Sequence, residues 1–194
     1  TEKSPGTTIF GVSGHVVRTG LFELPLGTPL EEIVFEHAGG VPEVTRGGSI
    51  VDISDEQWAR FLALNLTSAF YCCRAVVPHM KKARYGKIIN VSSVVGVMGN
   101  AGQANYAASK GGMISMSKSL ALEVARHNIR VNCVVPGFVH SEMTAGFNEK
   151  DFDKIIPMKR FGNAIEVAEV VYFLADKASY ITAETINISG GMVR

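Results

Sequence analysis

The stretch Asn90-Val-Ser-Ser-Val-Val-Gly-Val-Met-Gly-Asn-Ala-Gly-Gln-Ala-Asn-Tyr-Ala-Ala-Ser-Lys110 decides the fold expected for this chain. Tyr106 and Lys110 stand four residues apart, which places both side chains on one face of a helix. A neighbouring ammonium stabilises phenolate over phenol and lowers a tyrosine pKa that ordinarily lies near about 10. The pair therefore predicts a general acid/base at neutral pH, although the same spacing is also common in exposed surface pairs.

The segment before this helix predicts a ligand-binding edge. Lys87-Ile-Ile-Asn-Val91 is an apolar run typical of a buried parallel strand, and Ser93 follows it. Open α/β sheets hold their ligands at the carboxyl ends of such strands. The alternative is that Ser92 and Ser93 only close the strand, as small hydroxyl residues often do.

Strands and helices alternate along the rest of the chain, which predicts an α/β fold with a parallel sheet. Ser54 begins a cap-and-acid start to a long amphipathic helix that reaches about Lys82. The other expected elements are helices Ala104–Arg126 and Ala164–Ala175, a short helical lid Glu142–Ile156, and strands Lys87–Val91, Arg130–Val135 and Thr185–Ser189.

Several spaced motifs carry a family resemblance. They are Tyr106-x-x-x-Lys110, Asn65 within Leu64-Asn-Leu66, Pro136-Gly137 after a strand, and the ending Tyr180-Ile-Thr-Ala-Glu-Thr-Ile-Asn-Ile-Ser-Gly-Gly191. From about Val44 to its end the chain resembles the short-chain dehydrogenases/reductases, and in detail their 3-oxoacyl-(acyl carrier protein) reductases.

The resemblance implies a catalytic tetrad of Asn65, Ser93, Tyr106 and Lys110. Tyr106 would donate a proton to a substrate carbonyl oxygen that Ser93 holds. Lys110 would lower the tyrosine pKa and grip the cofactor ribose, and Asn65 would order a water relay. Taken alone, Asn65 is more often a surface or capping residue of a helix.

The resemblance also implies a cofactor, NADPH or NADH, and an acyl thioester substrate. The implied cofactor-binding residues are Tyr106, Lys110, Pro136, Gly137, Phe138 and Ser141. This sequence contains no Gly-rich pyrophosphate turn, because Phe10-Gly-Val-Ser-Gly14 and Ala38-Gly-Gly40 lack the required spacing. We therefore expect cofactor binding to be weak or lost, on a truncated Rossmann-like parallel sheet with an N-terminal β-β-α segment.

The N-terminal residues predict a different module. Thr7–Val16 and Leu21–Leu24 read as the strands of a hairpin, and Leu30–His37 reads as a capped helix. Residues from about Thr1 to Val41 resemble the SLBB (β-grasp) segment of the NADH-binding flavoprotein subunit of respiratory complex I. The expected organisation is a chimera, with a β-grasp-like fragment at 1–43 and a reductase part at 44–194.

Composition narrows the class of partner. A net charge of +1 and a hydrophobic content of 46% give no indication of nucleic-acid or membrane binding. No segment is expected to reach the length of a membrane span, and we expect a cytoplasmic protein. The basic cluster Lys81-Lys82-Ala-Arg84 reads as a solvated helix end. Cys72, Cys73 and Cys133 lack metal-ligand spacing and read as buried thiols, so no metal is expected.

Two functions follow. One is an NADPH-dependent reductase of 3-oxoacyl thioesters, and the other is a catalytically silent chimeric scaffold. A homodimer or homotetramer is also expected, because apolar helix positions exceed one buried stripe, unless these residues only fill the core. The positions are Phe61, Leu64, Phe70, Met113, Met116 and Leu120. An open sheet edge beside Lys87–Val91 would favour association further.

Overall fold

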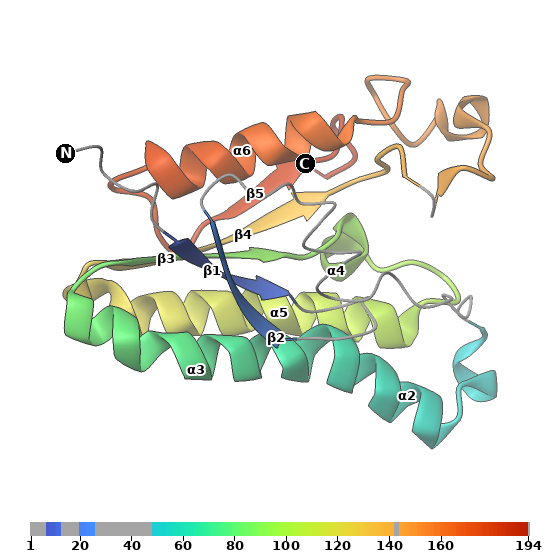
Figure 1. Ribbon diagram of the computed structural model, residues 1–194. Helices are drawn as coiled ribbons and strands as arrows, with labels where there is room; N and C mark the ends of the chain where they lie inside the picture. Colours follow the sequence, from blue (N-terminus) through green and yellow to red (C-terminus); the bar gives the residue numbers. More distant parts are fainter. Residues whose placement is uncertain (1–6, 13–19, 26–47, 142–143, 194) are drawn as a thin grey trace.

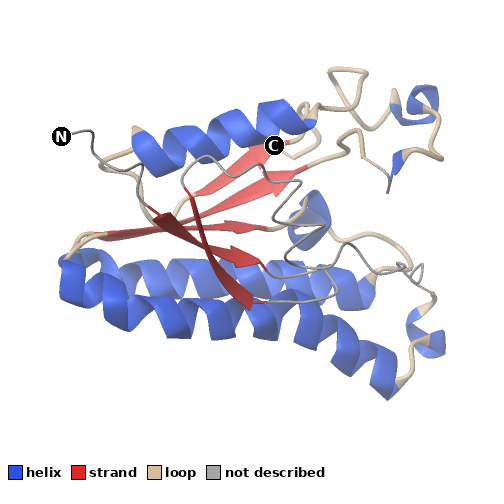
Figure 2. Ribbon diagram, in the orientation of Figure 1, coloured by secondary structure: helices blue, strands red, loops and turns tan. Residues whose placement is uncertain are grey.

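The computed structural model describes residues 7–12, 20–25, 48–141 and 144–193, and its main body is an α/β layer structure. A three-stranded parallel sheet has the order β3-β4-β5. Figure 1 shows α3 and α5 on one side of this sheet and α6 on the other, and Figure 2 shows the same layers by element type. The strands are β3 (Gly86–Val91), β4 (Ile129–Pro136) and β5 (Thr185–Ile188), and the covering helices are α3 (Ser68–Ala83), α5 (Ala104–Val124) and α6 (Ala164–Asp176). The expected α/β fold is confirmed.

Shorter elements complete the chain. They are η2 (Ile50–Asp52), α2 (Asp55–Leu62), η3 (Ala63–Thr67), α4 (Val94–Met98), η4 (Ala125–His127) and η6 (Glu149–Phe152). The expected start of the long helix is confirmed, because the Ser54 Oγ accepts the Gln57 N–H at 3.2 Å and the Gln57 Oε1 accepts the Ser54 N–H at 3.0 Å. This capping box satisfies two backbone donors that a helix N-terminus leaves without partners.

The π-helical turn η3 joins α2 and α3 into one continuous helix, Asp55–Ala83. By length and composition this 29-residue helix is able to cross a membrane. The expectation that no segment reaches the length of a membrane span is therefore wrong. The reason is that residues 61–78 of this helix carry a single charged side chain, Arg74, among mostly apolar residues. Core-flanking helices of globular domains pass the same test, so this observation assigns no membrane.

Two apolar clusters hold the layers together. On the α5 side, the buried residues Ala121, Val124, Ile129 and Val131 pack with Ile88 of β3. On the α6 side, Val134, Leu174 and Ala178 pack with Ile89. Ile88 and Ile89 thus face opposite sides of the sheet, as consecutive strand residues must. A parallel sheet covered on both faces explains why β3 and β4 read as apolar runs.

Close glycine packing sets the position of α5 against α4. A Cβ at Gly96 of α4 would lie 2.7 Å from the Lys110 backbone carbon and 2.8 Å from the Gly111 nitrogen. Any side chain there would push the two helices apart, because real Cβ atoms do not approach backbone so closely. Gly96 therefore lets α4 lie directly against the turn of α5 that carries Lys110.

The N-terminal hairpin forms a separate sheet. Strand β1 (Thr7–Val12) pairs antiparallel with β2 (Gly20–Pro25), with Thr7 opposite Pro25. Both strands contact α3, so the predicted hairpin and its packing on the reductase-like part are confirmed. The first strand ends at Val12, and residues 13–16 of the expected strand lie outside the described residues. So do the expected helix Leu30–His37 and the expected domain boundary at residues 43 and 44.

One predicted element is wrong. Among its described residues, 144–156, the expected helical lid Glu142–Ile156 has no α-helix and contains only 3-10 residues, η6 among them, and irregular turns. Its side chains pack instead in an aromatic cluster, in which the rings of Phe138 and Phe152 are 4.4 Å apart and those of Phe138 and Phe147 are 6.1 Å apart. These contacts hold Phe147 and Phe152 against Phe138, two residues after the end of β4.

Candidate active site

Ser93 and Tyr106 meet where β3 leads into α4. Ser93 is the N-cap of α4, and its Oγ accepts the Val95 N–H at 3.2 Å. Tyr106 lies in the first turn of α5, and its hydroxyl forms a hydrogen bond with Ser93. Burial raises the pKa of Tyr106, and the hydrogen bond from Ser93 lowers it in part. The phenol therefore keeps its proton at neutral pH and suits the role of an acid.

Lys110 lies one turn further along α5 and is buried. Its Nζ donates to the Val91 carbonyl oxygen at 3.0 Å and lies 5.8 Å from the centre of the Tyr106 ring. Burial lowers the pKa of Lys110 to about 8. The expected lowering of the tyrosine pKa by Lys110 is not found, because desolvation dominates the shift of Tyr106 and the ammonium binds a backbone carbonyl.

Neighbouring hydroxyl groups hold the backbone of α5 in place. The Ser92 Oγ donates to the Lys110 carbonyl at 2.8 Å, and the Ser109 Oγ donates to the Tyr106 carbonyl at 2.8 Å. The Asn105 Oδ1 accepts the Tyr106 N–H at 2.8 Å. Ser109, Asn105 and the Val91 carbonyl have no signal in the sequence, because a backbone acceptor and a local capping contact leave no motif.

Asn65 is fully buried inside the π-helical turn η3. Its Nδ2 donates to the Phe61 carbonyl at 3.2 Å, whereas its Oδ1 has no partner among the described residues. A buried acceptor without a hydrogen bond costs roughly 1–3 kcal/mol. This oxygen is thus able to accept a hydrogen bond from a water or a ligand. Element η3 packs on α5 at Gly112, where a Cβ would lie 2.8 Å from Leu66.

The remaining candidate residues lie at the end of β4. Pro136 ends that strand, and the Gly137 N–H donates to the Ile188 carbonyl at 2.9 Å. A Cβ at Gly137 would lie 3.0 Å from the Ser189 Cα, so this glycine serves close approach of two backbones. The exposed Ser141 donates its N–H to the Thr144 Oγ1 at 3.0 Å, and its carbonyl oxygen accepts the Thr144 N–H at 3.0 Å.

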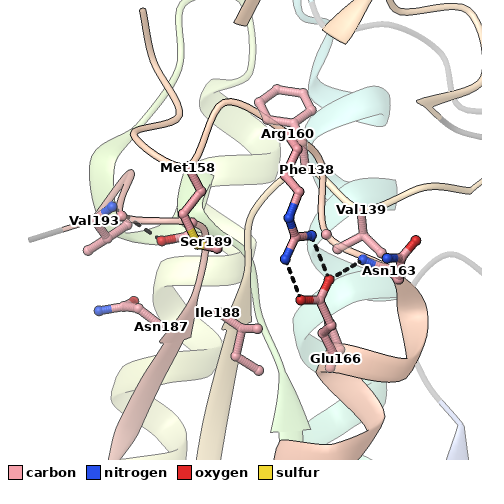
Figure 3. Close-up of a pocket in the computed structure, with 14 residues that line it drawn as sticks. Phe138, Val139, Met158, Arg160, Asn163, Glu166, Asn187, Ile188, Ser189 and Val193 are labelled. Atoms are coloured by element: carbon pink, nitrogen blue, oxygen red, sulfur yellow. Dashed lines mark hydrogen bonds and ion pairs between the residues drawn. The ribbon is translucent and has the colours of Figure 1, made fainter. Parts of the chain in front are cut away.

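Phe138 lines a cavity of about 330 Å³ between β4, β5 and the N-terminus of α6 (Figure 3). Across it the Arg160 guanidinium donates to both carboxylate oxygens of Glu166, at 2.8 and 2.7 Å. The Asn163 N–H also donates to Glu166, at 2.8 Å. These contacts, led by Arg160, lower the pKa of Glu166 to about 2.

The tetrad and this cavity are separate. Asn65, Ser93, Tyr106 and Lys110 line neither this cavity nor a second one of about 550 Å³ beside α4, α5 and β5 in the described part of the chain. The structure brings Ser93, Tyr106 and Lys110 together, and it places Phe138 with the aromatic cluster. Of the implied cofactor residues, only Tyr106 and Lys110 belong to the tetrad group.

The three cysteines belong to no group of metal ligands in the part of the chain that the structure describes. Cys73 and Cys133 are buried, as predicted, whereas Cys72 is half-buried. Burial is the main cause that raises the pKa of both buried thiols to about 11, so they stay protonated at neutral pH. Within the described residues, no group of three His, Cys, Asp or Glu side chains could hold a metal ion.

A family profile described as enoyl-(acyl carrier protein) reductase matches residues 32–193. The chain belongs to the short-chain dehydrogenase/reductase family. An SLBB domain profile matches residues 9–53, in agreement with the resemblance of the N-terminal part. The short-chain reductase match and the SLBB match overlap over residues 32–53, so they do not place a boundary at residue 43.

The curated relatives compared with this chain carry two different names, nodulation protein G and 3-oxoacyl-(acyl-carrier-protein) reductase. Nodulation protein G of Rhizobium sp. (strain N33) is 47% identical over 83% of this chain and 66% of its own length. The 3-oxoacyl-(acyl-carrier-protein) reductase of Chlamydia pneumoniae is 45% identical over 83% of this chain and 65% of its own length. The reductase of that name from Escherichia coli (strain K12) is 46% identical over 83% of this chain and 66% of its own length. The chain thus spans about two thirds of the length of these relatives.

Proposed function

We propose that this chain carries the proton-donating part of a ketoreductase that acts on 3-oxoacyl thioesters with NADPH, or with NADH. The observation that carries the proposal is the contact between Ser93 and Tyr106, with the Lys110 ammonium 5.8 Å from the phenol ring. The names of the curated relatives support the substrate class. Tyr106 in this arrangement is protonated and aimed at the group that Ser93 would hold.

The protein's own part in the reaction is proton transfer. The Tyr106 hydroxyl donates its proton to the substrate carbonyl oxygen, and the Ser93 hydroxyl donates a hydrogen bond to the same oxygen. A reduced nicotinamide, when bound, supplies the hydride. The raised pKa of Tyr106 keeps the phenol protonated before each turnover. The buried Asn65 Oδ1 is free to order a water that returns the proton.

The residues fit only one part of the cofactor. Tyr106 and Lys110 offer a hydroxyl and an ammonium that suit a ribose, provided that Lys110 leaves the Val91 carbonyl. No Gly-rich turn in this sequence suits the pyrophosphate. Each lost charge-assisted hydrogen bond is worth roughly 1.5–3 kcal/mol, so several of them weaken binding by orders of magnitude. The proposal is therefore an impaired reductase.

A catalytically silent chimeric scaffold is the second candidate. It is favoured by the separation of the tetrad from both cavities of the described residues. In this reading residues 1–43 and 44–194 are joined fragments of different origin, and the interest of the molecule lies in folding and assembly.

Calorimetric titration of the whole chain with NADPH separates the two candidates. Saturable binding that is lost in Lys110→Ala supports the reductase, and Lys118→Ala serves as a matched control because Lys118 is exposed on the same helix. No heat of binding up to millimolar NADPH supports the scaffold. NADH is titrated in parallel, because the sequence does not select between the two dinucleotides.

We also propose a cytoplasmic homodimer or homotetramer with no nucleic-acid or membrane partner. Of the apolar helix positions singled out above, Met113 is buried and Leu120 packs on the core, whereas Phe70 is 44% exposed. Core filling thus explains some of them, and Phe70 is left for an interface. Sedimentation of a 20.9 kDa monomer at micromolar concentration would contradict the assembly.

A further inference from the structure

The four tetrad residues belong to three separate elements. Asn65 lies in the continuous helix Asp55–Ala83, Ser93 follows β3, and Tyr106 and Lys110 lie on α5. Helix geometry fixes Tyr106 relative to Lys110, but it does not fix one element against another. Apolar packing has no preferred direction, so directional hydrogen bonds between these elements are the contacts best able to set their relative positions.

Asn90 of β3 makes hydrogen bonds with both helices that cover one face of the sheet. Its Nδ2 donates to the Ser117 Oγ of α5 at 2.8 Å, and its side chain forms a second hydrogen bond with Cys73 of α3. The Ser117 Oγ in turn donates to the Met113 carbonyl of its own helix at 2.7 Å. One side chain of β3 thus joins α3 and α5, which lie on the same side of the sheet in Figure 1.

The partners of Asn90 are buried, and its place in the strand is unusual. Cys73 and Ser117 are 6% and 1% exposed. Asn90 faces the same side of the sheet as Ile88, which packs on the apolar residues of α5. Asparagine is depleted in strands, and an apolar side chain would fill this position as Ile88 does. The amide therefore serves its hydrogen bonds and not the filling of the core.

Strand β3 and helix α5 touch through polar groups at two levels. At one level the Lys110 Nζ donates to the Val91 carbonyl at 3.0 Å, and at the other Asn90 donates to Ser117. Ser117 follows Lys110 by seven residues, which places both on one face of α5, two turns apart. Two contacts on one face resist both sliding and rotation of the helix against the strand.

We propose that Asn90 is a positioning residue, whose amide holds the Tyr106-bearing and Asn65-bearing helices in register with the strand that leads to Ser93. The inference rests on the proposed reductase function. Proton transfer needs heavy atoms within about 2.6–3.2 Å, and a misplacement of about 1 Å is able to cost about 10²-fold in rate. Asn90 acts only through the elements that it joins and takes no part in the proton transfer.

The chain offers a matched control for Asn90→Leu, which keeps a similar volume and removes the amide. Asn132 of β4 also donates and accepts, because its Nδ2 binds the Ile181 carbonyl at 3.0 Å and its Oδ1 accepts the Glu184 N–H at 3.1 Å. It is paired with Ile89, on the α6 face of the sheet. No tetrad residue lies on α6, so Asn132→Leu removes a buried amide without touching the proposed register.

The first measurement follows the titration of Lys110 by NMR of the whole chain without cofactor. Of the elements around this ammonium, β4 brings Cys133 and α5 brings Tyr106, whereas α4 and η3 carry no ionisable residue. Burial lowers the pKa of Lys110 to about 8. If α5 moves in Asn90→Leu, water reaches the ammonium, so we expect a midpoint at least about 0.5 pH unit higher. The midpoint in Asn132→Leu should stay within about 0.2 pH unit of the wild type.

The second measurement is the rate of acetoacetyl thioester reduction at saturating NADPH. We expect kcat to fall about tenfold or more in Asn90→Leu and to stay within about threefold in Asn132→Leu. Ser117→Ala removes the partner of Asn90 with a smaller change of packing, and it carries both measurements if Asn90→Leu does not fold. Ser117→Thr keeps the hydroxyl and should lie closer to the wild type than Ser117→Ala in both measurements.

Two results overturn the proposal. One is an unchanged Lys110 midpoint in Asn90→Leu and in Ser117→Ala, which means that the amide does not place α5. The other is an equal change in Asn132→Leu, which indicates a general loosening of the fold. A raised midpoint in a chain whose wild type reduces no thioester supports the positioning by Asn90 and contradicts the reductase function, so the two failures are told apart.

Discussion

Strands β3 and β4 lie side by side and have similar sequences, yet their surroundings differ. Both are apolar runs, and both are covered by α5 on one face and α6 on the other. The middle of β4 is fully buried between β3 and β5, whereas β3 is half-buried and pairs with β4 alone among the strands that the structure describes. An apolar sequence pattern thus predicts a strand, and the elements packed beside that strand decide how much of it is buried.

The contrast extends to what each strand carries at its carboxyl end. Strand β3 leads to Ser93 and supplies the Val91 carbonyl that binds Lys110. Strand β4 leads to Phe138 and the cavity crossed by Arg160 and Glu166. The proposed chemistry therefore sits beside the less protected strand, and the better-formed cavity sits beside the buried one.

The largest expected effect comes from comparing a substitution near the carboxyl end of β3 with one in the cavity beside β4. Tyr106→Phe should lower the reduction of an acetoacetyl thioester by about 10²–10⁴-fold, because it removes the proton donor and leaves the packing intact. Arg160→Gln in the cavity beside β4 is the control and should leave the rate within about threefold. The measurement is NADPH consumption at saturating thioester. Equal losses in both variants would move the chemistry to the β4 cavity.

The pH dependence of the unfolding free energy reports how strongly Lys110 is desolvated at the carboxyl end of β3. Its pKa is about 8 in the folded chain against 10.5 for the free side chain, so the unfolded state binds more protons between these values. The unfolding free energy of the wild type, relative to Lys110→Met, should rise by about 3 kcal/mol as pH increases through that window. Urea denaturation at pH 7 and pH 10 measures the difference. A flat difference would mean that water reaches the ammonium.

A matched truncation compares the two strands directly. Val134→Ala on β4 removes fully buried methyl groups and should lower the unfolding free energy by about 2–3 kcal/mol, whereas Val91→Ala on β3 should cost less than about 1 kcal/mol. Both are read from urea denaturation at one pH. If Val91→Ala cost as much as Val134→Ala, the side of β3 away from β4 would be covered as completely as β4 is.

The smallest effect concerns the exposed pair Arg160–Glu166. The pKa of Glu166 is lowered to about 2, so the pair stabilises the fold above the ordinary carboxyl pKa and the gain is lost as pH falls toward 2. Arg160→Gln should therefore show a slightly lower melting temperature than the wild type at pH 6 and no difference near pH 2. A difference that grows on acidification would contradict this sign.

The sequence by itself determined the elements and their local signals. Ser54 predicted a helix start that the capping box confirms, and the apolar runs at Lys87–Val91 and Arg130–Val135 predicted the strands. The family motifs predicted the meeting of Ser93, Tyr106 and Lys110, because a strand end and one helix face fix these positions locally.

Only the tertiary structure decided what surrounds these residues. The direction of the Tyr106 pKa depends on burial by segments far apart in the chain, and the Val91 carbonyl became the acceptor of Lys110 because β3 lies against α5. The expected lid became irregular because aromatic packing onto Phe138 outweighed helix formation. Burial, and with it each pKa and each open edge, is a property of neighbours that no local pattern contains.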